Sequence, residues 1–234
     1  MSRGAVSVGM AASLGGMAWA VRGRSSAVFG PSVWRGCGAR KTVALTFDDG
    51  PSPGTPALLQ LLEQYKIPAT FFQIGENALH YPETARAVST AGHEIGNHSQ
   101  THPNFAFKPR ACIHDEFARG QQSLNRVTGF TPTLLRAPYG VRWPGFSGMQ
   151  RSLGLKGVMW SVLGLDWKLP AAAIAKRVIS RVRDGGIVCL HDGRGTLKDP
   201  DIRATIEAVR RIVPDLLEKG YHFETVTQIL CPMK

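Results

Sequence analysis

Few cysteines are present, and their spacing excludes two common kinds of cysteine site. The chain of 234 residues has four, Cys37, Cys112, Cys189 and Cys231, and no two of them form a Cys-x-x-Cys pair. A zinc ribbon and a thioredoxin-type redox motif both need such a pair, so neither is expected. Buried free thiols are the simplest expectation, and a disulfide between two of the four is the alternative.

Acidic residues are absent from the first 40 positions. That stretch holds five arginines, while the rest of the chain carries 23 basic and 17 acidic residues, a net charge of +6. Such a moderate excess suits an anionic polymer surface, such as cell-wall material or membrane headgroups. No basic run is interleaved with aromatic residues, so no nucleic-acid partner is expected.

A long hydrophobic run is also missing. Residues 5–20 are uncharged, follow Arg3 and end in a small-x-small pattern at Ala18 and Ala20, which is typical of a short secretion signal or anchor and too short for a membrane span. The alternatives are a Gly/Ser-rich leader or a wrongly assigned start. We expect residues 1–40 to be this leader and a basic tether, residues 41–234 to be the domain, and the protein to be secreted or envelope-associated; without a signal it is cytoplasmic.

From residue 41 onward, short apolar runs alternate with amphipathic segments of helical length. The hydrophobic content of 43% is enough for one sizeable core. Strands separated by helices indicate βαβ units and a parallel sheet, and six or seven such units close most naturally into a barrel. The expected strands are 43–47, 69–74, 93–97, 133–136, 157–162, 187–190 and 222–229, and the expected helices are 55–66, 82–91, 110–127, 171–183 and 202–218.

Chemically active side chains follow five of these strands. In parallel β/α folds the loops after the strands gather at one face, so residues at these positions are expected to meet. If these polar residues were placed by chance, they would be scattered along the chain instead of following the strands. The residues are Asp48 and Asp49, His98 and His102, Arg136 to Tyr139, Asp166 and Trp167, and His191 and Asp192.

His98 and His102 are the candidate metal ligands. Two imidazoles four residues apart on a turn can reach one ion, and Asp49 from another strand would complete a set of three. Three protein ligands leave one position open, which is typical of catalytic zinc. Taken alone, a histidine pair is more often a surface or core feature.

Proton transfer needs a base and an acid beside the metal. Asp48 is placed to be the base and His191, across the barrel mouth, to be the acid. Arg136 can orient Asp48; the alternative, a surface salt bridge, is less favoured because Arg136 follows two leucines and a proline fixes the loop after it. Asp166 can pair with His191 and raise its pKa, or cap a loop instead.

Trp167 and Leu190 are expected to form an apolar wall for a small acyl group, the alternative being that both are core residues. Pro138 and Tyr139 follow Arg136 and are expected beside the substrate.

The motifs together resemble the polysaccharide deacetylase family, also called the NodB homology domain or carbohydrate esterase family 4, over residues 42 to about 230. They are TFDDG at 46–50, HSQTH at 98–102, RAPY at 136–139, DW at 166–167 and LHD at 190–192. The resemblance implies an α/β fold, a distorted (β/α)7 TIM-like barrel, with a divalent metal, usually Zn²⁺, on Asp49, His98 and His102. It further implies Asp48 as base, His191 as acid, and the Tyr139 amide as a donor to the oxyanion.

One position departs from the family pattern. The fourth motif usually reads Asp-x-x-Asp-Trp, and Leu163 stands at its first position here. If the missing carboxylate tunes the acid, His191 becomes a weaker proton donor. Asp166 is still present.

The expected function is metal-dependent removal of acetyl groups from N-acetylated amino sugars of peptidoglycan or a chitin-like oligosaccharide. Two alternatives are O-deacetylation of xylan or another glycan ester, and a catalytically weak carbohydrate-binding domain. The expected partner is an acetylated polysaccharide, and a monomer is assumed.

Overall fold

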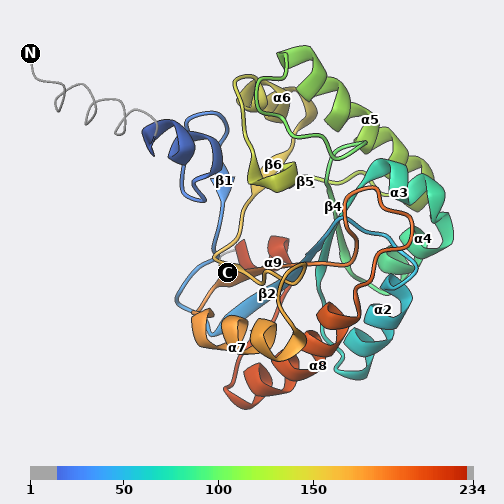
Figure 1. Ribbon diagram of the computed structural model, residues 1–234, viewed down its shortest axis with the longest axis vertical. Helices are drawn as coiled ribbons and strands as arrows, with labels where there is room; N and C mark the ends of the chain where they lie inside the picture. Colours follow the sequence, from blue (N-terminus) through green and yellow to red (C-terminus); the bar gives the residue numbers. More distant parts are fainter. Residues whose placement is uncertain (1–14, 231–234) are drawn as a thin grey trace, which may run out of the picture.

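A curled parallel β-sheet surrounded by helices forms the fold of the computed structural model, which describes residues 15–230 (Figure 1). The sheet order is β1-β6-β5-β4-β3-β2-β8-β7, with β9 paired to β2, and every ladder between named strands is parallel. Within the described residues no ladder joins β7 to β1, so the barrel is open there. The predicted distorted, TIM-like barrel is confirmed.

The strands are β1 (Ser32–Val33), β2 (Thr42–Asp48), β3 (Thr70–Gln73), β4 (Glu94–Asn97), β5 (Leu134–Leu135), β6 (Lys156–Val158), β7 (Val162–Leu163), β8 (Gly186–His191) and β9 (His222–Phe223). The helices are α2 (Thr55–Gln64), α3 (Gly75–His80), α4 (Pro82–Thr90), α5 (Arg110–Thr128), α6 (Phe146–Leu153), α7 (Ala171–Arg181), α8 (Arg203–Glu218) and α9 (Val226–Leu230), with a 3-10 turn, η1, at Pro138–Gly140. Residues 15–22 are also helical.

Strand β2 is the centre of the sheet. All seven of its residues are buried, as expected for a β-branched and aromatic run that is covered on both faces. It pairs with β3 on one side and β8 on the other, and the register places Asp48 beside His191. Hydrogen bonding of these two strands therefore brings the predicted base and acid together.

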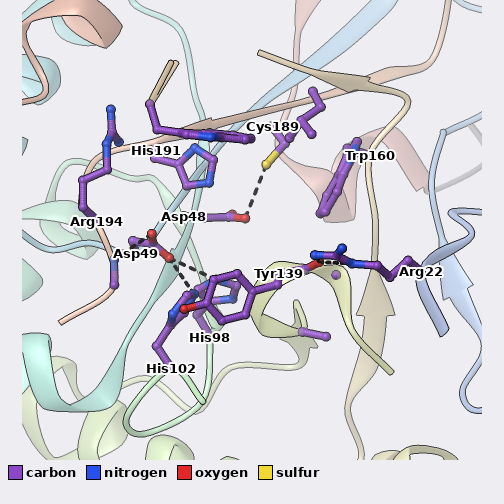
Figure 2. Close-up of a pocket in the computed structure, with 15 residues that line it drawn as sticks. Arg22, Asp48, Asp49, His98, His102, Tyr139, Trp160, Cys189, His191 and Arg194 are labelled. Carbon is purple, nitrogen blue, oxygen red and sulfur yellow. Dashed lines mark hydrogen bonds and ion pairs between the residues drawn. The ribbon is translucent and has the colours of Figure 1, made fainter. Parts of the chain in front are cut away.

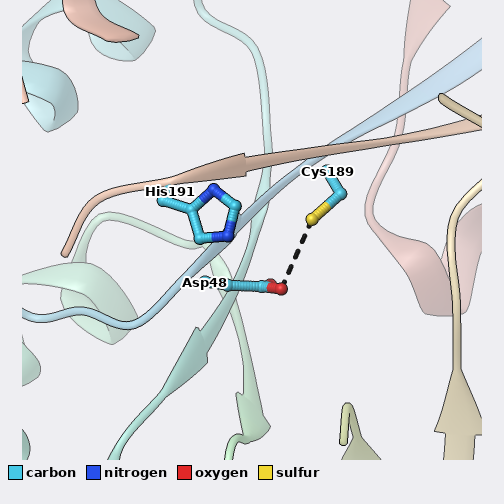
Figure 3. Close-up of side chains that lie close together, drawn as sticks. All are labelled: Asp48, Cys189 and His191. Carbon is cyan, nitrogen blue, oxygen red and sulfur yellow. Dashed lines mark hydrogen bonds between the residues drawn. The ribbon is translucent and has the colours of Figure 1, made fainter. Parts of the chain in front are cut away.

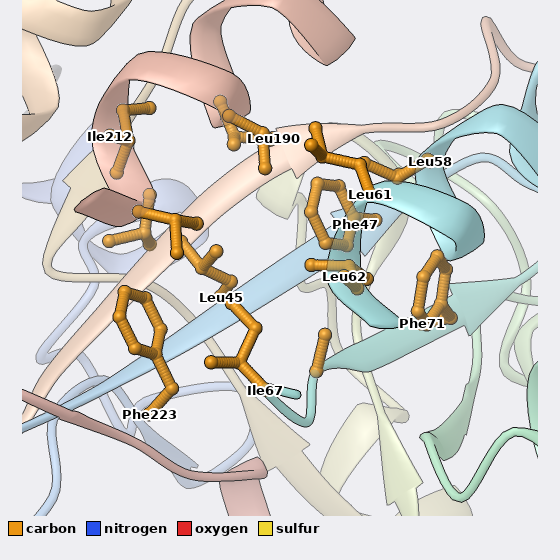
Figure 4. Close-up of a cluster of buried hydrophobic side chains, with 14 of the residues drawn as sticks. Leu45, Phe47, Leu58, Leu61, Leu62, Ile67, Phe71, Leu190, Ile212 and Phe223 are labelled. Atoms are coloured by element: carbon orange, nitrogen blue, oxygen red, sulfur yellow. The ribbon is translucent and has the colours of Figure 1, made fainter. Parts of the chain in front are cut away.

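The main hydrophobic core lies between the sheet and helices α2, α7 and α8 (Figure 4). Phe47 of β2 stacks on Phe71 of β3 with their ring centroids 5.0 Å apart. Leu45, Leu190 and Ile212 pack in the same cluster and are fully buried. This layer fixes the strands whose carboxyl ends carry the polar residues.

Two of the predicted strands are corrected by the structure. The strand expected at 157–162 is divided into β6 and β7, because Arg136 binds the carbonyl oxygens of Val158 and Met159 at the break. The strand expected at 222–229 ends after two residues. Helix α9 follows, because Thr225 and Gln228 form a reciprocal capping box: Thr225 N donates to Gln228 Oε1 (2.8 Å), and Gln228 N to Thr225 Oγ1 (3.3 Å).

The segment expected to be a tether packs against the barrel. Arg142 is 2% exposed, and its guanidinium donates to the carbonyl oxygens of Gly23, Ser26 and Gly30. Strand β1 adds to the sheet beside β6. Residues 1–14 of the expected leader lie outside the described residues. No helix among residues 15–230 is long and apolar enough to cross a membrane.

The described cysteines form no disulfide with one another. Cys189 is buried, as expected, whereas Cys112 is half-buried and Cys37 is exposed. Cys231 lies outside the described residues.

Candidate metal centre and active site

A pocket of about 460 Å³ opens at the carboxyl ends of the strands. Asp48 and Asp49 reach it from β2, the two histidines from the loop after β4, and His191 from β8 (Figure 2). The volume is within the range typical of small-molecule sites. The structure therefore brings the predicted metal ligands, base and acid to one cavity.

The turn after β2 separates the roles of the two aspartates. Asp49 has a left-handed backbone with φ of 72°, which turns its side chain away from the direction of Asp48. Asn77 Nδ2 donates to the Asp49 carbonyl oxygen at 2.8 Å and so fixes this turn. At Gly50 a Cβ atom would lie 2.0 Å from an oxygen of the buried Asp192 side chain, so only glycine fits there.

Asp49, His98 and His102 converge on one point. The Asp49 Oδ1 atom lies 3.2 Å from His98 Nε2 and 3.0 Å from His102 Nε2. The other oxygen, Oδ2, accepts a hydrogen bond from Gly195 N at 2.8 Å. These three side chains form one of the groups in the described residues that could hold a metal ion.

The hydrogen bonds around this triad fit a divalent cation. His98 Nδ1 lies 2.8 Å from the Arg136 carbonyl oxygen, to which it donates, so a neutral His98 presents the lone pair of Nε2. Asp49 Oδ1 is buried and receives no conventional hydrogen bond. Burial raises the pKa of Asp49, but His102 and His98 hold it well below its usual value. An ionised oxygen and two imidazole nitrogens thus face a shared point, as zinc sites require.

The loop that carries both histidines is held by a buried glutamate. Glu116 of α5 accepts hydrogen bonds from the backbone nitrogens of Gln100 and Thr101, at 3.1 and 2.9 Å. His102 N donates to Ser99 Oγ at 3.0 Å, which tightens the turn between the ligands. The ligand geometry is therefore set by the protein.

Asp48 is fixed by a fully buried arginine. Arg136 Nη1 donates to Asp48 Oδ1 at 2.6 Å and to Thr46 Oγ1 at 2.7 Å, and its guanidinium lies 4.1 Å from the centre of the Phe72 ring. The remaining Asp48 oxygen, Oδ2, accepts a weak bond from Cys189 Sγ at 3.4 Å. The predicted pairing of Arg136 with Asp48 is present, and the pair is buried.

His191 is paired with Asp166 as predicted. Its Nδ1 donates to Asp166 Oδ1 at 2.8 Å, while Asp166 Oδ2 accepts from Thr205 Oγ1 at 2.7 Å and from His191 N at 2.9 Å. Burial lowers the pKa of His191, but Asp166, Asp49 and Asp48 raise it to about 9. The imidazole is therefore protonated at neutral pH. Its contact with Asp166 does not need a carboxylate at Leu163.

The apolar wall differs in part from the prediction. Trp167 lies edge-on to His191 with ring centroids 5.0 Å apart, and Tyr139 lies against His102 at 4.6 Å; both line the pocket. Leu190 does not line it, because its side chain points into the core on the other face of β8. Pro138 is buried in η1, outside the pocket lining. Leu163 lines the pocket, which Leu190 does not.

Sequence reasoning missed several pocket residues. Cys189 lies two residues before His191 in β8. Because alternate residues of a strand share a face, Cys189 is expected on the same side as His191. Trp160 lies in the break between β6 and β7. Arg22 comes from the expected leader and Arg194 from the loop after β8, and no local pattern marks either.

Sequence comparison finds similarity to proteins of one family. Residues 35–158 match the sequence profile described as polysaccharide deacetylase. A chitooligosaccharide deacetylase from Bradyrhizobium sp. (strain ANU 289) is 34% identical over 198 residues, which cover 81% of this chain and 90% of that protein. A peptidoglycan-N-acetylglucosamine deacetylase from Bacillus cereus (strain ATCC 14579) is 34% identical over 202 residues, which cover 85% and 92%.

A solved structure shows why the site geometry matters. The wild-type BA3943 protein of Bacillus anthracis, described as a CE4 family pseudoenzyme, superposes with a TM-score of 0.78 at 25% identity and covers 86% of this chain and 69% of that one. The fold is therefore shared by proteins with and without activity. The side chains in the pocket must carry any functional argument.

Proposed function

We propose that this chain, which belongs to the polysaccharide deacetylase family, is a metal-dependent hydrolase that removes acetyl groups from N-acetylated amino sugars of a polysaccharide. One observation carries the proposal: a triad suited to a cation shares a pocket with a buried carboxylate and a protonated histidine. Metal-assisted amide hydrolysis uses a cation, a base and an acid. We place its action at the cell envelope, where such polymers lie.

Asp49, His98 and His102 would hold the ion. The donor set of one carboxylate and two imidazoles suits Zn²⁺. When bound there, a divalent ion supplies Lewis acidity, which polarises the acetyl carbonyl and makes water easier to deprotonate.

Asp48 takes the proton of the attacking water. Arg136 holds Oδ1 at 2.6 Å, so the free edge of the carboxylate, at Oδ2, faces the pocket. The base is oriented before the substrate enters.

His191 gives a proton to the departing amine nitrogen. Its Nδ1 is held by Asp166, so Nε2 is the nitrogen available to the substrate. A pKa of about 9 keeps this proton in place across neutral pH until the amine leaves. The base and the acid lie on neighbouring strands, and the base acts on the water while the acid acts on the amide nitrogen.

Tyr139 is placed to help with the negative charge that forms on the acetyl oxygen. The residue lines the pocket and has a left-handed backbone with φ of 57°. Within the described residues its N–H is used in no hydrogen bond to the protein. A free backbone donor at the pocket wall suits an oxyanion.

Acetate release from a panel of glycans tests the proposal. Oligomers of N-acetylglucosamine, soluble peptidoglycan and acetylated xylan are compared with and without a chelator and added Zn²⁺. We expect metal-dependent release from the N-acetylated substrates, and loss of release in the Asp48→Asn variant, which keeps all three metal ligands. Release from xylan alone would indicate an O-deacetylase. Glycan binding that survives chelation, with no acetate formed, would indicate a binding domain instead.

A further inference from the structure

A second group of potential metal ligands lies in the same pocket. Asp48, Cys189 and His191 each offer an atom, and the three atoms lie within 4.8 Å of one another (Figure 3). None of them belongs to the Asp49, His98 and His102 triad. The group joins the proposed base and acid to a thiol for which the proposed mechanism has no use.

Each of the three side chains has one ligand atom left over. Arg136 occupies Asp48 Oδ1, which leaves Oδ2, and Asp166 occupies His191 Nδ1, which leaves Nε2. Cys189 Sγ lies 3.4 Å from Asp48 Oδ2 and lines the pocket. In a tetrahedral zinc site, sulfur at roughly 2.3 Å and oxygen at roughly 2.1 Å from the ion lie about 3.6 Å apart. The observed separation is close to this value.

We propose that Asp48, Cys189 and His191 form a second, inhibitory site for a thiophilic divalent ion such as excess Zn²⁺ or Cd²⁺. Binding displaces the thiol proton and the Nε2 proton of the imidazolium, and both protons pass to solvent. The ion then coordinates Asp48 Oδ2, which would otherwise accept the proton of the water. It also coordinates His191 Nε2, which would otherwise protonate the amine. Occupation of this site stops catalysis while the first ion stays bound. The inhibitory effect rests on the proposed function, whereas the binding does not.

Metal stoichiometry tests the site without reference to activity. In equilibrium dialysis we expect the wild-type chain to bind two Cd²⁺ ions and Cys189→Ala to bind one. A thiolate-to-Cd²⁺ absorption band in the ultraviolet should appear with the second ion in the wild type and be absent in Cys189→Ala. Cys112→Ala is the matched control, because Cys112 is half-buried outside the pocket, and it should behave as wild type.

Inhibition tests its consequence. Excess Zn²⁺ should lower acetate release by at least tenfold in the wild type, and half-inhibition of Cys189→Ala should need at least tenfold more Zn²⁺. Cys189→Ser, which keeps the volume, serves if the alanine variant folds poorly. One bound Cd²⁺ ion in the wild type, or the same band and stoichiometry in both Cys189 variants, would overturn the site.

A different observation concerns Arg22, at the opposite end of the pocket from Arg194 (Figure 2). Its Nε and Nη2 atoms both donate to the Tyr139 carbonyl oxygen, each at 3.3 Å. Arg22 is the last residue of the helix at residues 15–22. The buried Arg142 binds residues 23–30, directly after it, and so fixes the position of Arg22. Arg22 is therefore held in a defined position at the rim of the pocket.

Its charge is not neutralised by the protein. Among residues 15–230, Arg22 is exposed and forms no ion pair with a carboxylate, whereas Arg194 lies 3.8 Å from Asp166 Oδ2. A guanidinium fork at a sugar-binding rim matches a carboxylate in shape and charge. We infer that Arg22 binds a carboxylate on the glycan, next to the sugar that is deacetylated. This inference deepens the proposed function and rests on it.

Matched substrates test the inference. For Arg22→Gln we expect KM to rise about tenfold on soluble peptidoglycan strands freed of their stem peptides, whose alternate sugars then carry free carboxylates. KM should change less than twofold on neutral N-acetylglucosamine oligomers of equal length. Arg22→Lys should recover part of the loss. Arg24→Gln is the control, because Arg24 bonds Ser161 outside the pocket.

An equal loss on both substrates would show that Arg22 only positions Tyr139, and no loss on either would remove its role. Both results overturn the inference. If the wild type releases no acetate at all, the proposed function fails, and the Kd of the acidic oligosaccharide for wild type and Arg22→Gln still decides whether Arg22 binds a carboxylate.

Discussion

The two halves of the pocket are completed in different ways. In the metal-binding half, made of Asp49, His98 and His102, a buried carboxylate oxygen faces two imidazole nitrogens and has no conventional donor. In the proton-transfer half, Asp48 and His191 are both held by buried partners within 2.8 Å. The first half needs a cation, and the second is organised by the protein alone.

This difference predicts that the halves can be damaged separately. Changes in the metal-binding half should remove the ion and the activity together. Changes in the proton-transfer half should lower kcat while the ion stays bound. The variants below are ordered from the largest expected effect to the smallest.

Asp49→Ala should have the largest effect. It removes the only carboxylate of the triad, so we expect loss of the tightly bound ion and a fall in acetate release of at least about 10³-fold, because the ion's Lewis acidity is lost with it. Metal analysis of the dialysed protein and an acetate assay measure both. Asp115→Ala, at an exposed ion pair on α5, is the control. Retention of the ion would show that the triad is not the metal site.

Asp48→Asn should separate the halves most clearly. We expect kcat to fall on the order of 10² to 10⁴-fold, the usual contribution of a general base, with the ion still bound. The amide oxygen can still accept from Arg136, which preserves the local packing. Loss of the ion in this variant would contradict the division into two halves.

Asp166→Asn should move the pH profile. Protonated His191 is the acid, so activity falls as pH rises through its pKa of about 9. Asp166 raises this pKa and burial lowers it, so without the carboxylate the pKa drops. The alkaline limb of kcat should therefore shift by more than one unit toward lower pH. A limb that stays in place would mean that another group sets it.

Thr205→Val should have the smallest effect. It removes one of the two donors to Asp166 Oδ2 and leaves the contact with His191. A buried hydrogen bond of this kind contributes about 1 kcal/mol, so we expect a several-fold decrease in kcat and a small decrease in Tm. A loss as large as that of Asp166→Asn would show that Thr205 is essential for placing the carboxylate.

Much of the site was predictable because parallel strands share one active face. Asp48 and Asp49 end a buried run, His191 ends another, and strand register alone brings Asp48 and His191 side by side. The Thr225 to Gln228 capping box is also present in the sequence. The segment also has the apolar and β-branched residues of a strand, and that pattern favours the wrong prediction.

The remaining features depend on contacts between distant segments. Glu116 reaches the histidine loop from α5, and Arg142 holds the segment that carries Arg22. Neither contact leaves a periodic pattern in the sequence. Leu190 was misplaced for a simpler reason: neighbouring residues of a strand face opposite sides, and Cys189 has the pocket side.

Zinc titration of the metal-free protein tests the central claim most directly. The chain is stripped with a chelator and titrated with Zn²⁺ while acetate release from an N-acetylglucosamine oligomer is followed. We predict no release without the ion and a linear rise that breaks at one ion per chain. Asp48→Asn should take up this first ion equally well and release acetate on the order of 10² to 10⁴-fold more slowly. Full release from the metal-free protein, or no uptake of the ion, would contradict the account.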